Sequence, residues 1–128
     1  MLLQDMNRFK DNKELANRQI ALLLSNYLNA ISEPQKAALW VRALKDEYYT
    51  VYLRPNPLIL LYEGENMVRL GRRSDANAFF LKFRDMYPQS VNAACYVYET
   101  EPDKELARAW LKKLLADHPN HWKVKKYR

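Results

Sequence analysis

Residues 57–88, PLILLYEGENMVRLGRRSDANAFFLKFRDMYP, decide the fold of this 128-residue chain. Two amphipathic segments lie on either side of Gly71, with a small residue, Gly64, inside the first segment. The second segment carries Ala76 twelve positions before Pro88. Apolar residues recur three and four positions apart in both segments, which is the spacing of one face of an α-helix. The stretch therefore predicts a helical hairpin that turns at Gly71.

Composition favours helix along the rest of the chain. Only two glycines occur, and the common residues Leu, Ala, Lys, Arg, Glu and Gln lose little side-chain freedom in a helix. At this length one domain covering residues 1–128 is expected. The longest apolar runs, 21–24 and 58–62, are far shorter than the roughly 20 residues of a membrane span. We therefore expect a soluble segment, whose charged opening lacks a signal-peptide pattern and could equally follow a cut inside a longer protein.

Start and stop signals divide the chain into about six predicted helices. The first helix is expected over residues 12–31 and the second is expected to end near Leu53, before Pro55. The expected start signals are a capping box of Asp11 and Glu14, the cap residues Ser32, Asn56, Ser74 and Ser90, and the turn Thr100-Glu101-Pro102-Asp103. The third, fourth and sixth helices are expected to end at Gly71, at Pro88 and at Pro119, and a short fifth helix is expected to begin at Ser90.

An internal period relates these helices. An alanine precedes a proline by twelve positions at 43 and 55, at 76 and 88, and at 107 and 119. The turns SEPQK at 32–36 and TEPDK at 100–104 are nearly the same pentapeptide. A period of about 30 residues is typical of helical solenoids. The period predicts hairpins over about 12–55, 56–88 and 89–119, followed by a basic tail at 120–128.

The middle and last hairpins resemble the tetratricopeptide repeat. Its small residue, alanine, large residue and closing proline correspond here to Gly64, Ala76, Phe80 and Pro88, and again to Cys95, Ala107, Leu111 and Pro119. The first hairpin departs from the pattern, since Glu47 stands where Phe80 stands and its second helix is about one turn longer. The resemblance implies an all-α, tetratricopeptide-like solenoid of three helical hairpins, in which small residues let neighbouring helices approach. It gives Cys95, which has no partner for an internal disulfide, a buried packing role.

The resemblance also implies a binding surface, because the first helix of each hairpin lines the concave side of such a solenoid. Tyr62 and Tyr96 lie on first helices. Ordinary half-buried packing is the alternative for each of these side chains taken alone. The expected groove for an extended partner segment consists of Leu58, Leu61, Tyr62, Glu65, Arg69 and Tyr96.

No pattern of catalytic residues occurs. The chain contains no glycine-rich phosphate loop, nucleophile elbow or paired-histidine metal motif. His118 and His121 lie near Asp117, but Pro119 breaks the helical face that would hold two ligands together. We therefore expect no metal, no cofactor and no active site in this segment.

The basic tail suggests a different class of function. Lys123, Lys125, Lys126 and Arg128 supply four of the six net positive charges, so residues 1–122 carry a net charge of +2. Trp122 and Tyr127 alternate with these cations and could meet nucleic-acid phosphates or an anionic membrane surface. A solvated, mobile terminus is the favoured interpretation, and nucleic acid is the less favoured partner.

A narrower resemblance concerns the short stretches LRPNP at 53–57, LGRR at 70–73 and MYP at 86–88. They are similar to the soluble C-terminal segment of bacterial Wzy/O-antigen-ligase-like membrane proteins, including pilin-type protein O-oligosaccharyltransferases. The resemblance implies a non-catalytic accessory domain in the bacterial envelope, on the periplasmic side, that binds or positions an acceptor protein or a glycan. Glycan transfer would then occur in a preceding membrane part. A free-standing adaptor would instead be cytoplasmic.

Overall fold

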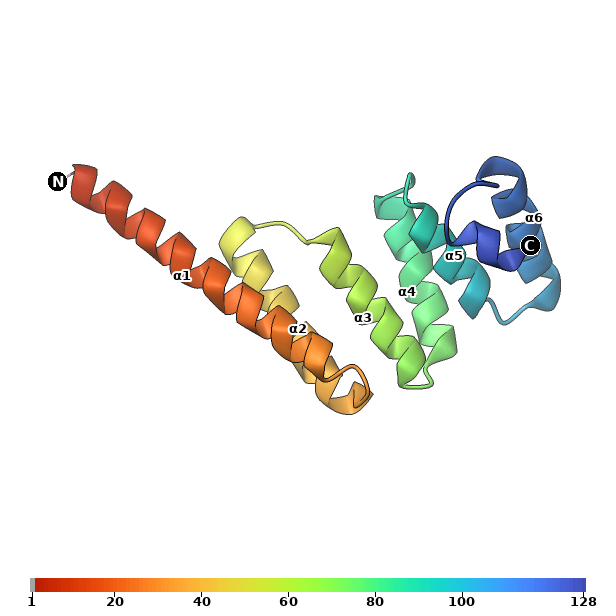
Figure 1. Ribbon diagram of the computed structural model, residues 1–128, viewed down its shortest axis with the longest axis horizontal. Helices are drawn as coiled ribbons and strands as arrows, with labels where there is room; N and C mark the ends of the chain where they lie inside the picture. Colours follow the sequence, from red (N-terminus) through yellow and green to blue (C-terminus); the bar gives the residue numbers. More distant parts are fainter. Residues whose placement is uncertain (1) are drawn as a thin grey trace. The chain divides into compact units, whose positions relative to one another are not determined.

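The computed structural model describes residues 2–128, with side chains from Lys13 onward, and all of its regular elements are helices (Figure 1). This confirms the predicted all-α class and the number of helices. The chain divides within its third helix into two compact units, Met1–Asn66 and Met67–Arg128, which we call the first unit and the second unit. The elements are α1 (Leu2–Asn29), α2 (Pro34–Tyr52), α3 (Pro57–Arg69), α4 (Arg73–Met86), α5 (Val91–Thr100), α6 (Lys104–Asp117) and the short 3-10 helix η1 (Val124–Tyr127).

The first unit is built on α1 and α2, which run antiparallel against each other (Figure 1). Tyr27 is fully buried at its centre, and its hydroxyl donates a hydrogen bond to the carbonyl oxygen of Tyr62 at 3.0 Å. The side-chain amide of Asn66 donates to the carbonyl oxygen of Pro34 at 2.9 Å. These bonds attach α3 to the helix pair around a core of Leu23, Tyr27, Ala30, Ala37, Val41, Leu44 and Ile59.

In the second unit each helix packs against the next, α4 against α5 and α5 against α6. Ala76 and Phe80 are fully buried, as the repeat pattern requires of its alanine and its aromatic residue. The amide of Asn77 joins α4 to α5 by donating to the carbonyl oxygen of Val97 and the hydroxyl of Thr100, both at 3.2 Å. Packing between consecutive helices is the arrangement that a helical-repeat solenoid needs.

Two of the predicted caps are confirmed. The Asn56 side chain accepts hydrogen bonds from the backbone N–H groups of Leu58 at 2.9 Å and Ile59 at 3.2 Å, immediately before Pro57 opens α3. The Ser90 hydroxyl accepts from the N–H of Ala93 at 3.2 Å. Both side chains satisfy N–H groups that have no partner inside their helix.

The predicted turn at Gly71 is also confirmed. Gly71 has a φ of 78°, which is in the left-handed region that favours glycine. Its N–H donates to the carbonyl oxygen of Val68, and the N–H of Arg72 donates to that of Met67, both at 3.0 Å. This pair of bonds is the Schellman motif, which ends α3. The next residue after Gly71, Arg72, is the cap position of α4.

Three predicted helix starts were wrong. α1 begins at Leu2, so Asp11 lies inside a helix; the residues before it include no proline or glycine that would end one. The cap position of α2 is Glu33 and that of α4 is Arg72, where Ser32 and Ser74 were expected. Only Leu70, Gly71 and Arg72 separate α3 from α4, which leaves Ser74 within the first turn of α4.

The two similar pentapeptide turns fold differently. Pro34 is the first residue of α2, whereas α6 begins two residues after Pro102. Asp103 caps α6, since its carboxylate accepts from the N–H groups of Glu105 at 2.9 Å and Leu106 at 3.2 Å. Aspartate is a stronger N-cap than the glutamine that occupies the same place in the first turn. Asp103 therefore supports the later start of α6, whereas α2 has no side-chain cap.

The prediction of a solvated C-terminal tail was wrong. Residues 121–128, which we call the strap, fold back as a turn and η1 onto α5 and α6. Val124 is fully buried against Cys95 and Leu114. The strap folds because Val124 and Tyr127, three positions apart, lie on one side of a 3-10 helix and remove apolar surface from water.

Leu53 provides a test of the backbone geometry that ends α2. It has φ 55° and ψ 29°, a left-handed conformation that is strained for leucine, and its side chain is 77% exposed. We predict that Leu53→Gly stabilises the chain by about 0.5–1 kcal/mol in urea denaturation, because strain is relieved and little packing is lost. Leu39→Gly, at a 70% exposed position inside α2, should instead destabilise by about 1 kcal/mol. If Leu53→Gly and Leu39→Gly destabilised the chain equally, the left-handed backbone conformation of Leu53 would be contradicted.

Candidate functional site

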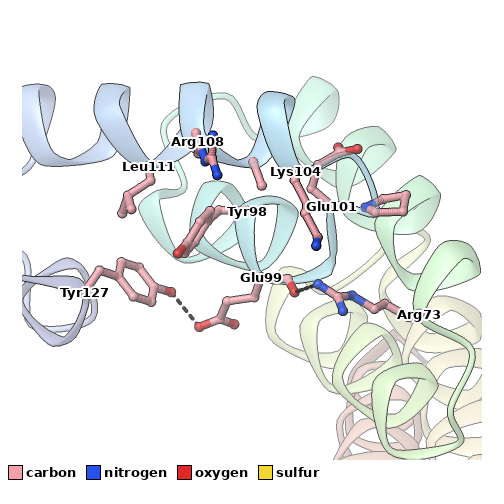
Figure 2. A pocket seen from close by; sticks show the side chains of 10 residues that line it. Arg73, Tyr98, Glu99, Glu101, Lys104, Arg108, Leu111 and Tyr127 are labelled. Atoms are coloured by element: carbon pink, nitrogen blue, oxygen red, sulfur yellow. Dashed lines mark hydrogen bonds between the residues drawn. The ribbon is translucent and has the colours of Figure 1, made fainter.

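A cavity of about 540 Å³ opens in the second unit, a size within the range of ligand-binding clefts. We call it the α5–α6 pocket, and Figure 2 shows its side chains. Tyr98 from α5 faces α6 across the pocket, and Tyr127 from η1 approaches it from the strap. The lining residues are Arg73, Tyr98, Glu99, Glu101, Pro102, Lys104, Ala107, Arg108, Leu111 and Tyr127.

Helical spacing places the α6 residues of the pocket. Lys104, Arg108 and Leu111 are four and three positions apart, so they lie on one face of α6. Ala107 and Leu111, expected from the repeat pattern to pack between helices, are half-buried and also line the pocket. Tyr98 meets Tyr127 edge to face with ring centroids 4.9 Å apart, which gives the pocket an aromatic wall.

The pocket carries three cations. Arg73 uses its guanidinium to donate to the carbonyl oxygen of Glu99 at 2.9 Å. Lys104 and Arg108 are exposed and form no ion pair or hydrogen bond through their side chains with the residues that the structure describes. Two cationic side chains on adjacent turns of one helix are therefore available to a ligand.

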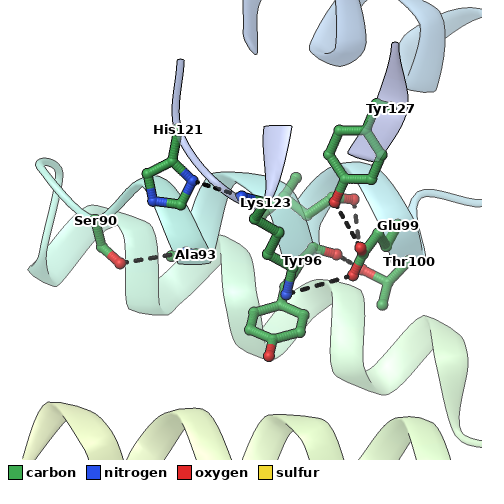
Figure 3. A network of polar contacts seen from close by, with 9 residues as sticks. Ser90, Ala93, Tyr96, Glu99, Thr100, His121, Lys123 and Tyr127 are labelled. Carbon is green, nitrogen blue, oxygen red and sulfur yellow. Dashed lines mark hydrogen bonds and ion pairs between the residues drawn. The ribbon is translucent and has the colours of Figure 1, made fainter. Parts of the chain in front are cut away.

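The two carboxylates of the pocket are already engaged. Glu99 accepts a hydrogen bond from the Tyr127 hydroxyl at 2.5 Å, and its other oxygen lies 3.8 Å from the Lys123 ammonium (Figure 3). Glu101 is 8% exposed and accepts from the N–H of Asp103 at 3.2 Å. Burial, together with the Glu99 carboxylate, raises the pKa of Tyr127 far above its usual range, so its hydroxyl stays a donor. The charge left for a ligand is therefore mainly positive.

Tyr96, expected in the groove, has a packing role in the second unit. Its ring is stacked on Phe80, with centroids 4.6 Å apart and planes inclined by 14°. The Lys123 ammonium lies 3.3 Å from the centroid of the same ring, which places it on the face opposite Phe80. Figure 3 shows Lys123 between Tyr96 and Glu99. Both faces of the Tyr96 ring are therefore covered by the chain itself.

The other predicted groove residues lie on α3. Leu58 is 52% exposed, whereas Leu61, Tyr62 and Glu65 are half-buried in the first unit. The Tyr62 ring packs on Tyr27 with centroids 5.2 Å apart, so part of its surface belongs to the core. Arg69 is exposed and, like Tyr96, belongs to the second unit. A groove made of all six residues stays a prediction.

The C-terminal histidines take part in the local structure of the strap. His121 accepts a hydrogen bond from the backbone N–H of Lys123 through Nδ1 at 3.2 Å (Figure 3). His118 ends α6, where its N–H donates to the carbonyl oxygen of Leu114 at 2.9 Å. Among the described residues, no group of three histidine, cysteine or acidic side chains is placed to hold a metal ion.

The α5–α6 pocket was not among the sites predicted from the sequence. One signal was available, since Lys104, Arg108 and Leu111 repeat at helical spacing after a predicted helix start. The contribution of Tyr127 could not be predicted, because it depends on the strap folding back across an interval of 28 residues to reach Glu99.

No protein-family model matches the chain, and no match was found among curated proteins or solved structures. Among the described residues, no helix combines the length and the apolar character needed to cross a membrane.

The rate at which Cys95 is alkylated tests whether the strap packs over α5. Burial raises the pKa of the Cys95 thiol above its usual value and Val124 packs beside it, so little thiolate forms and reagents are excluded. We predict that iodoacetamide alkylates Cys95 slowly in the native chain. In Val124→Asp, which introduces a buried charge, the alkylation rate should increase at least about tenfold. Val68→Asp, at a 42% exposed position, is the control and should leave the rate unchanged. Native alkylation as fast as that of the urea-unfolded chain would contradict the packing of the strap.

Proposed function

We propose that this chain is a non-catalytic protein-interaction domain, and that its α5–α6 pocket binds an extended, acidic segment of a partner protein. The observation that carries the proposal is the pair Lys104 and Arg108. Their side chains are exposed on one face of α6, beside an aromatic wall, and have no partner among the described residues. Charges held in this way favour a ligand of opposite charge and accelerate its encounter.

Electrostatics favour carboxylates as the groups that bind. Arginine holds a carboxylate with two parallel hydrogen bonds, and lysine adds a second point charge one helical turn away. Glu99 is paired with Lys123 and Tyr127, so it repels an incoming anion less than a free carboxylate would. Glu101 is buried and directed to the N–H of Asp103. An acidic segment therefore gains more at this pocket than a basic one.

The aromatic wall suits a peptide. Tyr98 and Tyr127 present large, rigid surfaces on which apolar parts of a partner segment can pack. Helices hold most of the lining side chains in place before binding, so little order has to be gained on this side of the interface. The ten lining residues include no serine, cysteine or histidine, so the lining lacks the members of a Ser–His or Cys–His pair.

Charge reversal on α6 tests the proposal directly. The probe is a fluorescently labelled peptide of alternating glutamate and tyrosine, measured by anisotropy at several salt concentrations. We predict that Arg108→Glu weakens its binding at least about tenfold, because one attractive contact becomes repulsive. Lys112→Glu is the matched control: it makes the same change of net charge at an exposed site on α6 outside the pocket.

Two results would contradict the proposed site. Equal loss of binding in Lys112→Glu would mean that net charge alone attracts the peptide. Loss of binding in Leu58→Glu, with Arg108→Glu unaffected, would assign the partner to the exposed surface of α3. Helix content measured by circular dichroism must be unchanged in each variant.

As a wider role, we propose an accessory domain of a bacterial envelope glycosyltransferase, positioned in the periplasm, with the pocket holding the acceptor protein. This role is supported by the resemblance of residues 53–57, 70–73 and 86–88 to such domains. The coding sequence upstream of Met1 tests it. Several membrane spans in frame would agree with this role, and a free-standing reading frame would contradict it.

A further inference from the structure

The strap has two different faces. Its inner face holds Val124, which is fully buried, and Lys123, which is 9% exposed. The residues on the opposite side are all exposed, and they are Trp122, Lys125, Lys126 and Arg128. Because the inner residues pack on α5 and α6, the outer residues are presented to solvent on a folded support.

Trp122 is held in place although its side chain is 60% exposed. Its indole is stacked with the His121 ring at a centroid distance of 5.8 Å, and the Lys126 ammonium lies 4.9 Å from its centroid. Single exposed apolar side chains are common on protein surfaces, so Trp122 points to a binding role only together with the cations of the strap. Tryptophan prefers the boundary between water and the hydrocarbon of a bilayer.

The cations that follow Trp122 have no acidic residue beside them within the strap. Residues 118–128 contain no aspartate or glutamate. Lys123 is engaged with Glu99 and Tyr96, but Lys125 and Arg128 form no ion pair with any residue that the structure describes. One exposed indole and three exposed cations therefore lie within seven residues of sequence, and the Lys126 ammonium is the cation in contact with the indole.

We infer that the outer face of the strap binds an anionic membrane surface. Basic side chains are attracted to acidic headgroups, and an adjacent indole adds affinity by entering the interfacial region. Nucleic acid fits less well, because single strands are bound along grooves with several aromatic platforms, whereas this face carries one. The near-neutral charge of residues 1–122 adds little attraction for a long polyanion.

This surface is separate from the α5–α6 pocket. None of its four residues lines the pocket, to which the strap contributes only Tyr127. The inference therefore does not depend on the proposed peptide binding, and one surface can be removed without changing the other.

Sedimentation of the full chain with vesicles tests the inference. We expect binding to vesicles of phosphatidylcholine and phosphatidylglycerol, and none to phosphatidylcholine alone. Lys125→Gln with Lys126→Gln should weaken binding at least about tenfold, since each basic residue near an acidic surface contributes several-fold in affinity. Lys112→Gln with Lys113→Gln removes the same charge from exposed sites on α6 and should have little effect.

Trp122 provides a second readout. Vesicles should shift the tryptophan emission of the chain to shorter wavelength, and Trp122→Ala should lose this shift and bind less tightly. Absence of binding to anionic vesicles would overturn the inference, as would equal binding to neutral vesicles or equal weakening by the α6 control pair. Binding to a single-stranded oligonucleotide without binding to vesicles would assign the surface to nucleic acid instead.

Discussion

The packing of the strap on α5 is the interaction on which the second unit depends. Val124 fills a fully buried site beside Cys95 and Leu114, and burial of a valine side chain contributes about 1.5–3 kcal/mol. Lys123 is placed between the Tyr96 ring at 3.3 Å and the Glu99 carboxylate at 3.8 Å. Without these contacts α5 would expose an apolar side, the α5–α6 pocket would lack Tyr127, and Trp122 would have no fixed orientation.

The strap also explains how two different surfaces arise from one short segment. Tyr127 completes the pocket, and together with Lys123 it engages the Glu99 carboxylate, which leaves Lys104 and Arg108 as the available charges there. Its outer residues carry the indole and the remaining cations. A domain with both surfaces would hold a partner segment near an anionic bilayer, which is compatible with the proposed envelope role.

Local signals allowed much of the fold to be predicted from sequence. Asn56, Gly71 and Ser90 act on backbone groups within three residues of themselves, so their roles could be predicted without knowledge of the fold. Ser32 and Ser74 were predicted as caps from the same kind of signal, but α2 begins at Pro34 and α4 at Arg73, so neither serine is at a cap position. The folded strap and the pocket could not be predicted, because their contacts join residues far apart in sequence. The position of Tyr96 on the first helix of a hairpin was likewise predicted. Its contacts with Phe80 and Lys123 were not predicted.

Whether the strap is folded onto α5 and α6 can be tested most directly by measuring the contacts of the Val124 side chain. NMR spectra of the methyl-labelled chain would show whether the Val124 methyl groups have cross-relaxation with those of Leu114, which lies in the same buried cluster. We predict such cross-peaks, together with methyl shifts displaced from random-coil values by the neighbouring rings of Tyr98 and Tyr127. Random-coil shifts for Val124 without cross-peaks to Leu114 would contradict it.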